Sequence, residues 1–211
     1  MINTEIEKKS LLNYDCGAEF LHKEMHYPTN FNMGSSPAKA AAFDGDADRL
    51  IYFTKAEGSK PIIIDGDKQF ALIGNYINEL LREVGVEVPM IMVNTAYSNG
   101  KANQYLEANN TPRKCVPTGV KNAHPVQQKY VIGANDEPNG HGTVYVNWPE
   151  LNQLLNGKLE NPACKKLIAF LKISNIYVGD AIANLLLLEA IMRDKGMTIK
   201  EFSEIYHDNP S

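Results

Sequence analysis

The 211-residue sequence predicts an α/β protein with mixed, largely parallel sheets flanked by helices. Short apolar runs typical of buried strands alternate along the chain with longer segments of helical periodicity. The composition, with 44% hydrophobic and 22% charged residues, is that of an ordinary globular protein. The N-terminus has no apolar signal region, and the most apolar stretch, 181–192, is interrupted by Asn184 and Glu189. We therefore expect a soluble, cytoplasmic protein that has no membrane partner.

The first strand-and-helix unit follows a strand predicted at 50–53. A second apolar run, at 61–64, predicts another strand, and from 70 to 84 apolar residues recur at helical spacing. Asp67 is placed to cap the start of this helix and Gly85 to end it. The unit predicts a strand that leads directly into a long amphipathic helix.

The remainder of the chain continues the alternation. It predicts strands at 89–93, 114–117 and 143–146, a turn-rich segment at 134–142, and helices at 101–109, around 126–129, and at 180–193. Thr198 and Glu201 form a capping box before one more helix. We expect residues 1–65 to form part of one domain, because they hold too few strands for a core of their own. Residues 66–211 are expected to form a second domain.

Charge and cysteine content narrow the functional classes. With 21 basic and 25 acidic residues, the net charge of −4 provides no broad basic surface, so we expect no nucleic-acid partner. The chain has three cysteines, Cys16, Cys115 and Cys164, and no CxxC spacing. An odd number without that spacing predicts neither a disulfide framework nor a zinc site.

The segment DGDADR, at 44–49, is the strongest functional signal. Asp44, Asp46 and Asp48 repel one another, and Gly45 and Ala47 between them permit a tight loop that brings the three carboxylates together. Hard divalent cations such as Mg²⁺ and Ca²⁺ prefer such all-oxygen sites. A solvated acidic turn is the structural alternative.

Two other kinds of metal loop are compared with this segment. A calcium-binding EF-hand requires Gly and Glu at the positions that Arg49 and Lys55 occupy, which excludes it. A haloacid-dehalogenase-like phosphatase also places DxD after a buried strand, and the chain repeats DGD at 65–67, so a Mg²⁺-dependent phosphatase stays open. For Asp65 and Asp67 we favour a structural role as a turn and helix cap.

Three polar residues near the N-terminus are predicted to lie on the surface. His22, Glu24 and His26 contain an HxE pattern. No PCxxC follows it, and the glutamate is misplaced for a zinc protease, so neither kind of zinc site is supported.

A glycine-rich turn, ANDEPNGHG, presents Glu137, Asn139 and His141 at alternate positions. An acceptor, an amide and an imidazole suit a polyol, because neighbouring sugar hydroxyls each require a donor and an acceptor. An ordinary hairpin loop is the structural alternative, since Asn-Gly is foremost a turn signal.

The segment PTGVKNAH follows the strand predicted at 114–117. It offers Thr118, Gly119, Lys121 and His124 at the carboxyl end of a strand, where α/β folds place ligand loops. Lysine there can meet a phosphate as a point charge, whereas a helix start with a solvated lysine is the structural alternative.

Taken in chain order, the loops DGDADR, PTGVKNAH and ANDEPNGHG resemble those of the phosphoacetylglucosamine mutase branch of the α-D-phosphohexomutase superfamily. FDGDADRLIYF, IDGDK, TAYSNGKANQYLE, PTGVKNAH, NGHGT and VGDAIANLLLLEAI all fit that branch, and the resemblance covers roughly residues 12–211. It implies that Mg²⁺ is the cofactor, held by the three aspartates of the loop, and that Arg49 contacts the phosphoryl group. It also implies that the following residues read or line the sugar-phosphate site: Glu137, Asn139, His141, Thr118, Gly119, Lys121 and His124.

The resemblance further implies a reaction. It is the interconversion of N-acetylglucosamine 6-phosphate and 1-phosphate through a phosphoserine and a bisphosphate intermediate, on the route to UDP-N-acetylglucosamine. Two features depart from the family pattern: Pro138 follows Glu137 where the branch usually has alanine, and neither a T-A-S-H-N-P-like serine loop nor an R-P-S-G-T-E-like phosphate loop occurs. The chain therefore resembles part of the second and the whole of the third of the family's four domains. A sugar-phosphate-binding protein without catalysis is a further alternative.

The absence of these two loops leads to a first testable prediction. We expect the 211 residues alone not to interconvert the 6- and 1-phosphates of N-acetylglucosamine, because they contain no phosphoserine loop. Incubation with the 6-phosphate, Mg²⁺ and a trace of the bisphosphate, followed by phosphorus NMR, measures this directly. Formation of the 1-phosphate would contradict the prediction.

Overall fold

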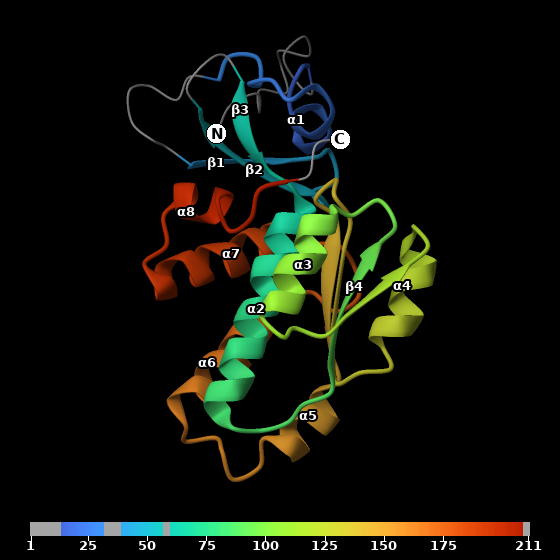
Figure 1. Cartoon of the computed structure of the whole chain (residues 1–211), viewed down its shortest axis with the longest axis vertical. Coiled ribbons are helices and arrows are strands. Elements are labelled where there is room, and N and C mark those ends of the chain that lie inside the picture. Colours follow the sequence, from blue (N-terminus) through green and yellow to red (C-terminus); the bar gives the residue numbers. More distant parts are fainter. Residues whose placement is uncertain (1–13, 32–38, 57–59, 209–211) are drawn as a thin grey trace.

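The computed structural model describes residues 14–31, 39–56 and 60–208. These residues form two sheets surrounded by helices (Figure 1). The strands are β1 (Lys39–Phe43), β2 (Leu50–Lys55), β3 (Pro61–Ile64), β4 (Met90–Thr95), β5 (Arg113–Val116), β6 (Ile132–Asp136) and β7 (Gly142–Val146). The helices are α1 (Ala18–Glu24), α2 (Gly66–Val84), α3 (Gly100–Ala108), α4 (Val120–Gln127), α5 (Trp148–Leu154), α6 (Pro162–Leu171), α7 (Ala181–Lys195) and α8 (Ile199–Ser203). The predicted α/β class is confirmed.

The smaller sheet has the strand order β1-β2-β3 and is antiparallel throughout. Leu50 and Tyr52 of its central strand belong to the main core, whereas Ile51 and Phe53 pack with Leu21 of α1 on the other face. Since side chains alternate across a strand, both faces of β2 are covered, and its sequence is continuously apolar. The strand predicted from this run is confirmed.

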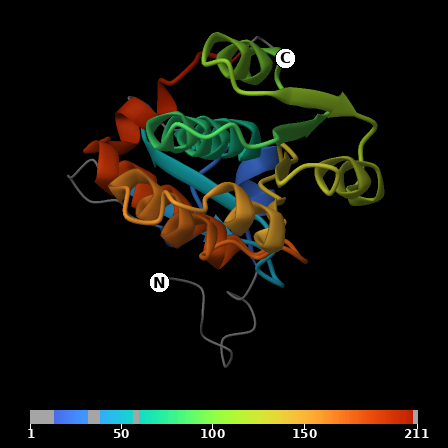
Figure 2. The ribbon, with the colours of Figure 1, turned by 90° about the horizontal axis from the view of Figure 1, so that it is seen from below.

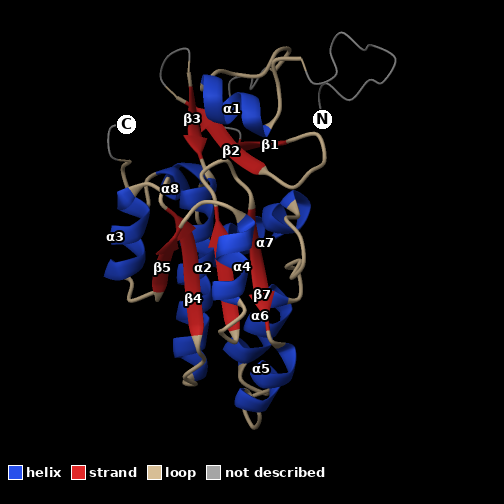
Figure 3. Ribbon diagram, turned by 90° about the vertical axis from the view of Figure 1, so that its right-hand side faces the viewer, coloured by secondary structure: helices blue, strands red, loops and turns tan. Residues whose placement is uncertain are grey.

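The larger sheet has the order β5-β4-β6-β7. Strand β4 is parallel to β5 and β6, whereas β7 is antiparallel to β6, so this sheet is mixed and largely parallel as predicted. The carboxyl ends of β4, β5 and β6 consequently share one edge of the sheet. Figure 3 shows the larger sheet below the smaller one, and the loop after β6 reaches β2 through a hydrogen bond from Leu50 N to Gly140 O.

Helices cover both faces of the larger sheet. Helix α4 lies on the right-hand side in Figure 1, where Ala123 packs with Ile91, Val93 and Val116. Helices α2, α6 and α7 lie on the left, and Figure 2 shows the same separation from below. The alternate residues Met90 and Met92 of β4 belong to the core on that second side.

Helix α2 begins at a different residue from the one predicted. Asp65, in an extended conformation, is its N-cap and accepts a hydrogen bond from Lys68 N at 3.0 Å. The prediction that Asp67 caps the helix is therefore wrong: Asp67 lies buried in the first turn. Gly85, with a φ of 71°, ends the helix as predicted.

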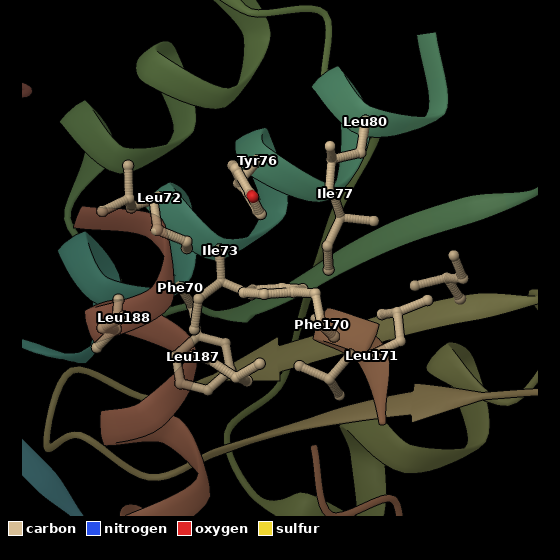
Figure 4. Packing of buried hydrophobic residues seen from close by; sticks show 14 of the residues in the cluster. Phe70, Leu72, Ile73, Tyr76, Ile77, Leu80, Phe170, Leu171, Leu187 and Leu188 are labelled. Atoms are coloured by element: carbon tan, nitrogen blue, oxygen red, sulfur yellow. The ribbon is translucent and has the colours of Figure 1, made fainter. Parts of the chain in front are cut away.

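The main core forms around α2 (Figure 4). Ile73 and Tyr76 face α6 and α7, and the ring of Tyr76 meets that of Phe170 edge-on, with centroids 5.0 Å apart. Leu187 closes the same cluster and is fully buried. Since burying one such side chain is worth about 1.5–3 kcal/mol, this cluster is a main source of the stability of the fold.

A buried glutamine fastens α2 to the smaller sheet. The Gln69 side chain donates hydrogen bonds to Leu50 O at 2.8 Å and to Ile64 O at 2.9 Å. Leu50 and Ile64 also belong to the same hydrophobic core as α2. The smaller sheet is therefore packed against α2 rather than linked to it by a flexible tether.

Most other predicted elements are confirmed, but two strands, β1 and β6, were not predicted. The predicted strands at 89–93, 114–117 and 143–146 are β4, β5 and β7, the predicted helices at 101–109 and 180–193 are α3 and α7, and the capping box begins α8. Strand β6 was not predicted, because its polar last residues, Asn135 and Asp136, were assigned to the turn at 134–142. The helix predicted around 126–129 begins earlier, after Gly119, and ends at Gln127. No helix within the described ranges is both long and apolar enough to cross a membrane.

Candidate active site

The loop between β1 and β2, residues 44–49, is named here the metal loop. Ala47 has a φ of 57° and donates a backbone hydrogen bond to Asp44 O at 3.3 Å, which makes the turn tight. Asp44 Oδ1 accepts from the backbone N–H groups of Asp48 and Arg49, each at 3.1 Å. The loop thereby places carboxylate oxygens of Asp44, Asp46 and Asp48 within 4.8 Å of one another.

This set of carboxylates fits a hard cation. Magnesium takes six oxygen ligands at about 2.1 Å, so oxygens on its two sides are about 4.2 Å apart, and small rotations bring the three carboxylates into reach. Burial and the neighbouring Asp44 raise the pKa of Asp48. Burial also pushes the pKa of Asp44 upward, but the backbone N–H of Arg49 and its other hydrogen bonds bring it below its usual value. Asp48 therefore ionises less readily than an isolated aspartate, because its negative charge would be repelled by the neighbouring carboxylates. A bound cation would offset this repulsion.

Arg49 lies where it can balance part of this charge. Its Nε atom is 3.7 Å from Asp44 Oδ2 and 3.7 Å from Asp48 Oδ1, and its side chain is about one-third exposed. The guanidinium group therefore remains beside the metal loop while part of it reaches solvent. This is the position expected for a group that contacts a phosphoryl oxygen next to the cation.

The connection between β6 and β7, residues 137–141, is named here the sugar loop. Gly140 N donates to Glu137 O at 3.0 Å, so the loop is a tight turn with Pro138 at its second position. Proline suits that position, where its fixed φ matches the turn and no N–H is required. Its carbonyl accepts from Gly66 N at 3.1 Å, and Asn139 Nδ2 donates to Glu137 Oε2 at 3.2 Å. Pro138 therefore fits the turn, and Glu137 and Asn139 lie side by side.

The sugar loop and the metal loop are joined. Leu50 N, at the end of the metal loop, donates to Gly140 O at 3.1 Å, and Arg49 and His141 form a backbone bridge. His141 Nε2 is 3.7 Å from Asp48 Oδ2. His141 therefore lies beside the cation site.

The start of α7 closes the other side of the metal loop. Ala181 N donates to Ala47 O at 2.9 Å, and Asp180 caps the helix by accepting from Ala183 N. A Cβ atom on Gly179 would lie 2.6 Å from His141 Nε2, so the chain passes closely over the imidazole. This contact holds the imidazole ring beside the metal loop.

The segment after β5 contributes one of its predicted residues to the lining of the cavity. Thr118 lines the cavity described below, and Gly119, with a φ of 113°, precedes α4. His124 is half-buried, and burial together with the nearby His141 lowers its pKa. Lys121 is exposed in the first turn of α4 and is not among the residues that line this cavity.

A cavity of about 420 Å³ lies at the carboxyl edge of the larger sheet, beside the sugar loop. It is lined by His22, Thr95, Tyr97, Thr118, Glu137, Pro138 and Asn139. Thr95 and Tyr97 were not predicted, although they follow a strand in the same way as Thr118. His22 was predicted to be a surface residue, whereas its side chain is half-buried and lines this cavity, because α1 packs against the smaller sheet. Glu24 and His26 are exposed as predicted.

A larger cavity, of about 590 Å³, lies between α5 and α6. Lys172 is its one ionisable lining residue, and the others are apolar or uncharged. It is lined by no carboxylate for a cation and lies away from both loops, so the smaller cavity beside the sugar loop is the candidate site.

Buried carboxyl groups support the site from below. Asp136, at the end of β6 directly before the sugar loop, is hydrogen-bonded to Asp67 in the first turn of α2. Two carboxyl groups can share a hydrogen bond only when one holds a proton, and burial raises the pKa of Asp136 well above its usual value. Asp67 Oδ2 also accepts from Asn99 N at 2.5 Å, after β4. The pair thus links the bases of two cavity-lining loops, and no sequence signal identified Asp136.

The sequence is similar to those of known phosphoacetylglucosamine mutases. Residues 65–197 match the family model described as phosphoacetylglucosamine mutase AMG1, domain III. Phosphoacetylglucosamine mutase 2 of Schizosaccharomyces pombe is 36% identical over 217 residues, covering 100% of this chain and 40% of that protein. The phosphoacetylglucosamine mutase of Mus musculus is 38% identical, covering 95% of this chain and 38% of that protein. The chain thus spans about two fifths of the length of these relatives.

Solved structures give the same result. The Aspergillus fumigatus N-acetylphosphoglucosamine mutase in complex with GlcNAc-6P and magnesium superposes with a TM-score of 0.86 at 34% identity, covering 95% of this chain and 42% of that one. An N-acetylglucosamine-phosphate mutase of the α-D-phosphohexomutase superfamily, in the apo-form, gives a TM-score of 0.87 at 33% identity, covering 97% and 41%. The likeness therefore includes both sheets and nearly the whole chain.

Proposed function

Because the chain belongs to the phosphoacetylglucosamine mutase family, we propose that it supplies the cation-binding and sugar-binding part of an enzyme that interconverts N-acetylglucosamine 6-phosphate and 1-phosphate. The observation that carries this proposal is the hydrogen bond from Leu50 N to Gly140 O. It joins a loop suited to a cation to a loop suited to a polyol, as phosphate transfer on a sugar requires.

We also propose a division into two domains. Residues 1–65 would be the part of a second domain that carries the metal loop, and residues 66–211 would be a third domain that carries the sugar loop. The match of the family's domain III to residues 65–197 supports this boundary. The remaining domains of the mutase would be the partners of both parts.

Magnesium is the proposed cofactor, held by Asp44, Asp46 and Asp48. When bound, it would offset the negative charge that grows on the phosphoryl group during transfer. The Aspergillus fumigatus relative was solved in complex with magnesium, which supports the choice of this ion.

The side chains of this chain would bind and orient the sugar phosphate. Glu137 accepts hydrogen bonds from sugar hydroxyls, Asn139 both donates and accepts, and His141 reaches the part of the sugar nearest the cation. Arg49 donates to the phosphoryl oxygens, and Thr118 and His124 complete the wall of the site. Lys121 would meet a phosphate from the solvent side.

The sugar must bind in two orientations, since each of its two oxygens has to face the phosphoryl donor in turn. In this family the donor is a phosphoserine, and the two orientations are related by a bisphosphate intermediate. Groups that both donate and accept serve two orientations of a ring better than donors alone. Positioning and fixed charges, rather than a nucleophile of this chain, would supply its share of catalysis.

The structure does not support the second motif of the haloacid-dehalogenase alternative, the DGD at 65–67. Asp65 caps α2, as the structural interpretation expected, and Asp67 is buried and hydrogen-bonded. Neither carboxylate is free to act as a nucleophile on a substrate in the cavity.

Asp46→Asn tests the cation site. Asp46 is exposed, so its exchange should lower Mg²⁺ affinity at least tenfold with little change in the free energy of unfolding, because one of three carboxylate ligands is lost. Calorimetric titration of the 211-residue chain with Mg²⁺ measures this. Asp15→Asn, at an exposed aspartate, is the matched control and should keep wild-type affinity. Equal Mg²⁺ affinity in both variants would overturn the proposed site.

A further inference from the structure

One wall of the cavity comes from a different part of the fold. Six of its seven lining residues lie at or just after the carboxyl ends of strands of the larger sheet, and the seventh, His22, comes from α1 beside the smaller sheet. Helix α1 is fixed in place, because Ala18 and Leu21 are fully buried against Ile51 and Phe53. The imidazole of His22 is therefore held at the wall of the cavity by a packed helix.

The hydrogen-bonding capacity of His22 is unused. Its side chain is half-buried, and none of the hydrogen bonds found within the described residues involves its imidazole. Burial lowers the pKa of His22, and the nearby Asp67 opposes this only in part. The imidazole is thus neutral at pH 7, with one donor and one acceptor nitrogen.

A neutral donor and acceptor matches a hydroxyl group better than a phosphate. Phosphate oxygens accept only, and proteins usually bind them with cations or with several N–H groups. A sugar hydroxyl both donates and accepts, as a neutral imidazole does. Glu137 and Asn139 line the same cavity and suit other hydroxyls of the same ring.

We propose that His22 is a further sugar-binding residue, hydrogen-bonded to a hydroxyl of the bound sugar phosphate in the cavity that Glu137 and Asn139 also line. This rests on the proposed function. It assigns to α1 a role in substrate specificity, since a hydroxyl of the wrong stereochemistry would leave the half-buried imidazole without a partner. Loss of one such hydrogen bond corresponds to roughly a five- to tenfold loss of affinity.

Calorimetric titration of the 211-residue chain with N-acetylglucosamine 6-phosphate, in the presence of Mg²⁺, tests the proposal. His22→Ala should lower affinity about five- to tenfold, and His22→Gln should recover part of it, because the amide also donates and accepts. His26→Ala is the matched control, since His26 is exposed just beyond the same helix, and it should bind as the wild type does.

A second measurement does not depend on how well the variants fold. In the wild-type chain, the imidazole nitrogen NMR signals of His22 should shift on addition of the sugar phosphate, whereas those of His26 should not. Binding by the wild type with neither a shift at His22 nor a loss in His22→Ala would overturn this inference and leave the proposed function intact. Failure of the wild type to bind would overturn both.

Discussion

Gly140→Ala is expected to separate the sugar loop from the metal loop and to lower affinity for N-acetylglucosamine 6-phosphate at least tenfold. Gly140 has a φ of 92°, and a Cβ atom there would lie 2.1 Å from Leu50 O. Atoms cannot approach so closely, so the hydrogen bond from Leu50 N to Gly140 O must break or β2 must move. We expect the free energy of unfolding to fall by about 3 kcal/mol, the sum of backbone strain and a disrupted buried contact.

Gly85→Ala is the matched variant that separates the cost of backbone strain from the cost of the disrupted contact with Leu50. Gly85 also has a positive φ, 71°, but a Cβ atom there would meet nothing within 4 Å. Its replacement should cost about 1 kcal/mol of backbone strain and leave sugar-phosphate affinity unchanged. Urea unfolding and calorimetric titration of both variants measure the comparison. Equal losses in the two variants would show that the contact with Leu50 does not hold the sugar loop.

The parts of the fold that were predicted are those whose sequence pattern is local. The helix at 66–84 has apolar residues on every turn and a glycine at its end, and the run 50–53 is continuously apolar. Strand β6 was missed because its second half, Asn135 and Asp136, is polar although both residues are buried. Their partners are distant in sequence: Asn135 Oδ1 accepts from Thr143 N at 2.9 Å, and Asp136 pairs with Asp67. A local pattern carries no information about such partners.

The same reasoning explains the candidate site. The spacing of DGDADR was sufficient to predict the convergence of its carboxylates, because the loop is six residues long and folds on itself. The position of His141 beside Asp48 depends on the pairing of β2 with the sugar loop, which the sequence does not encode locally. His22 was missed for the same reason, since only the packing of α1 brings it to the cavity.

Stability of the chain is expected to fall as pH rises from 6.5 to 8. Asp136 is buried with Asp67, Asp65 and Glu137 as its charged neighbours, so burial and these like charges raise its pKa well above the usual value. Burial and Asp67 raise the pKa of Asp65 to about 7. For both groups the folded pKa exceeds the unfolded one, so the folded chain binds more protons between the two values. Asp136 and Asp65 therefore contribute their whole stabilising effect below the pKa that each has in the unfolded chain. They lose it as the pH rises through the pKa that each has in the folded chain.

The size of the effect follows from proton linkage. A proton held by the folded state alone changes the free energy of unfolding by about 1.4 kcal/mol per pH unit. Asp136 and Asp65 should therefore each lower the stability over the part of this range in which only the folded chain holds their proton. The lowered pKa values of His22 and His124 act in the opposite direction, but mainly below the usual histidine pKa of about 6.5. The chosen window therefore isolates the carboxyl groups.

Asp136→Asn tests the assignment by urea unfolding across this range in the absence of metal. The amide has the shape of the carboxyl group and still donates to Asp67, but it cannot ionise, so the decline in stability with rising pH should become smaller. Asp180→Asn, at the N-cap of α7, controls for the exchange itself, because asparagine caps a helix nearly as well as aspartate. A pH profile for Asp136→Asn parallel to that of the wild type would mean that Asp136 is not the group that holds the proton. If the profile flattens, the base of the sugar loop is held by a neutral acid, and sugar-phosphate affinity in the wild type should weaken over the same pH range.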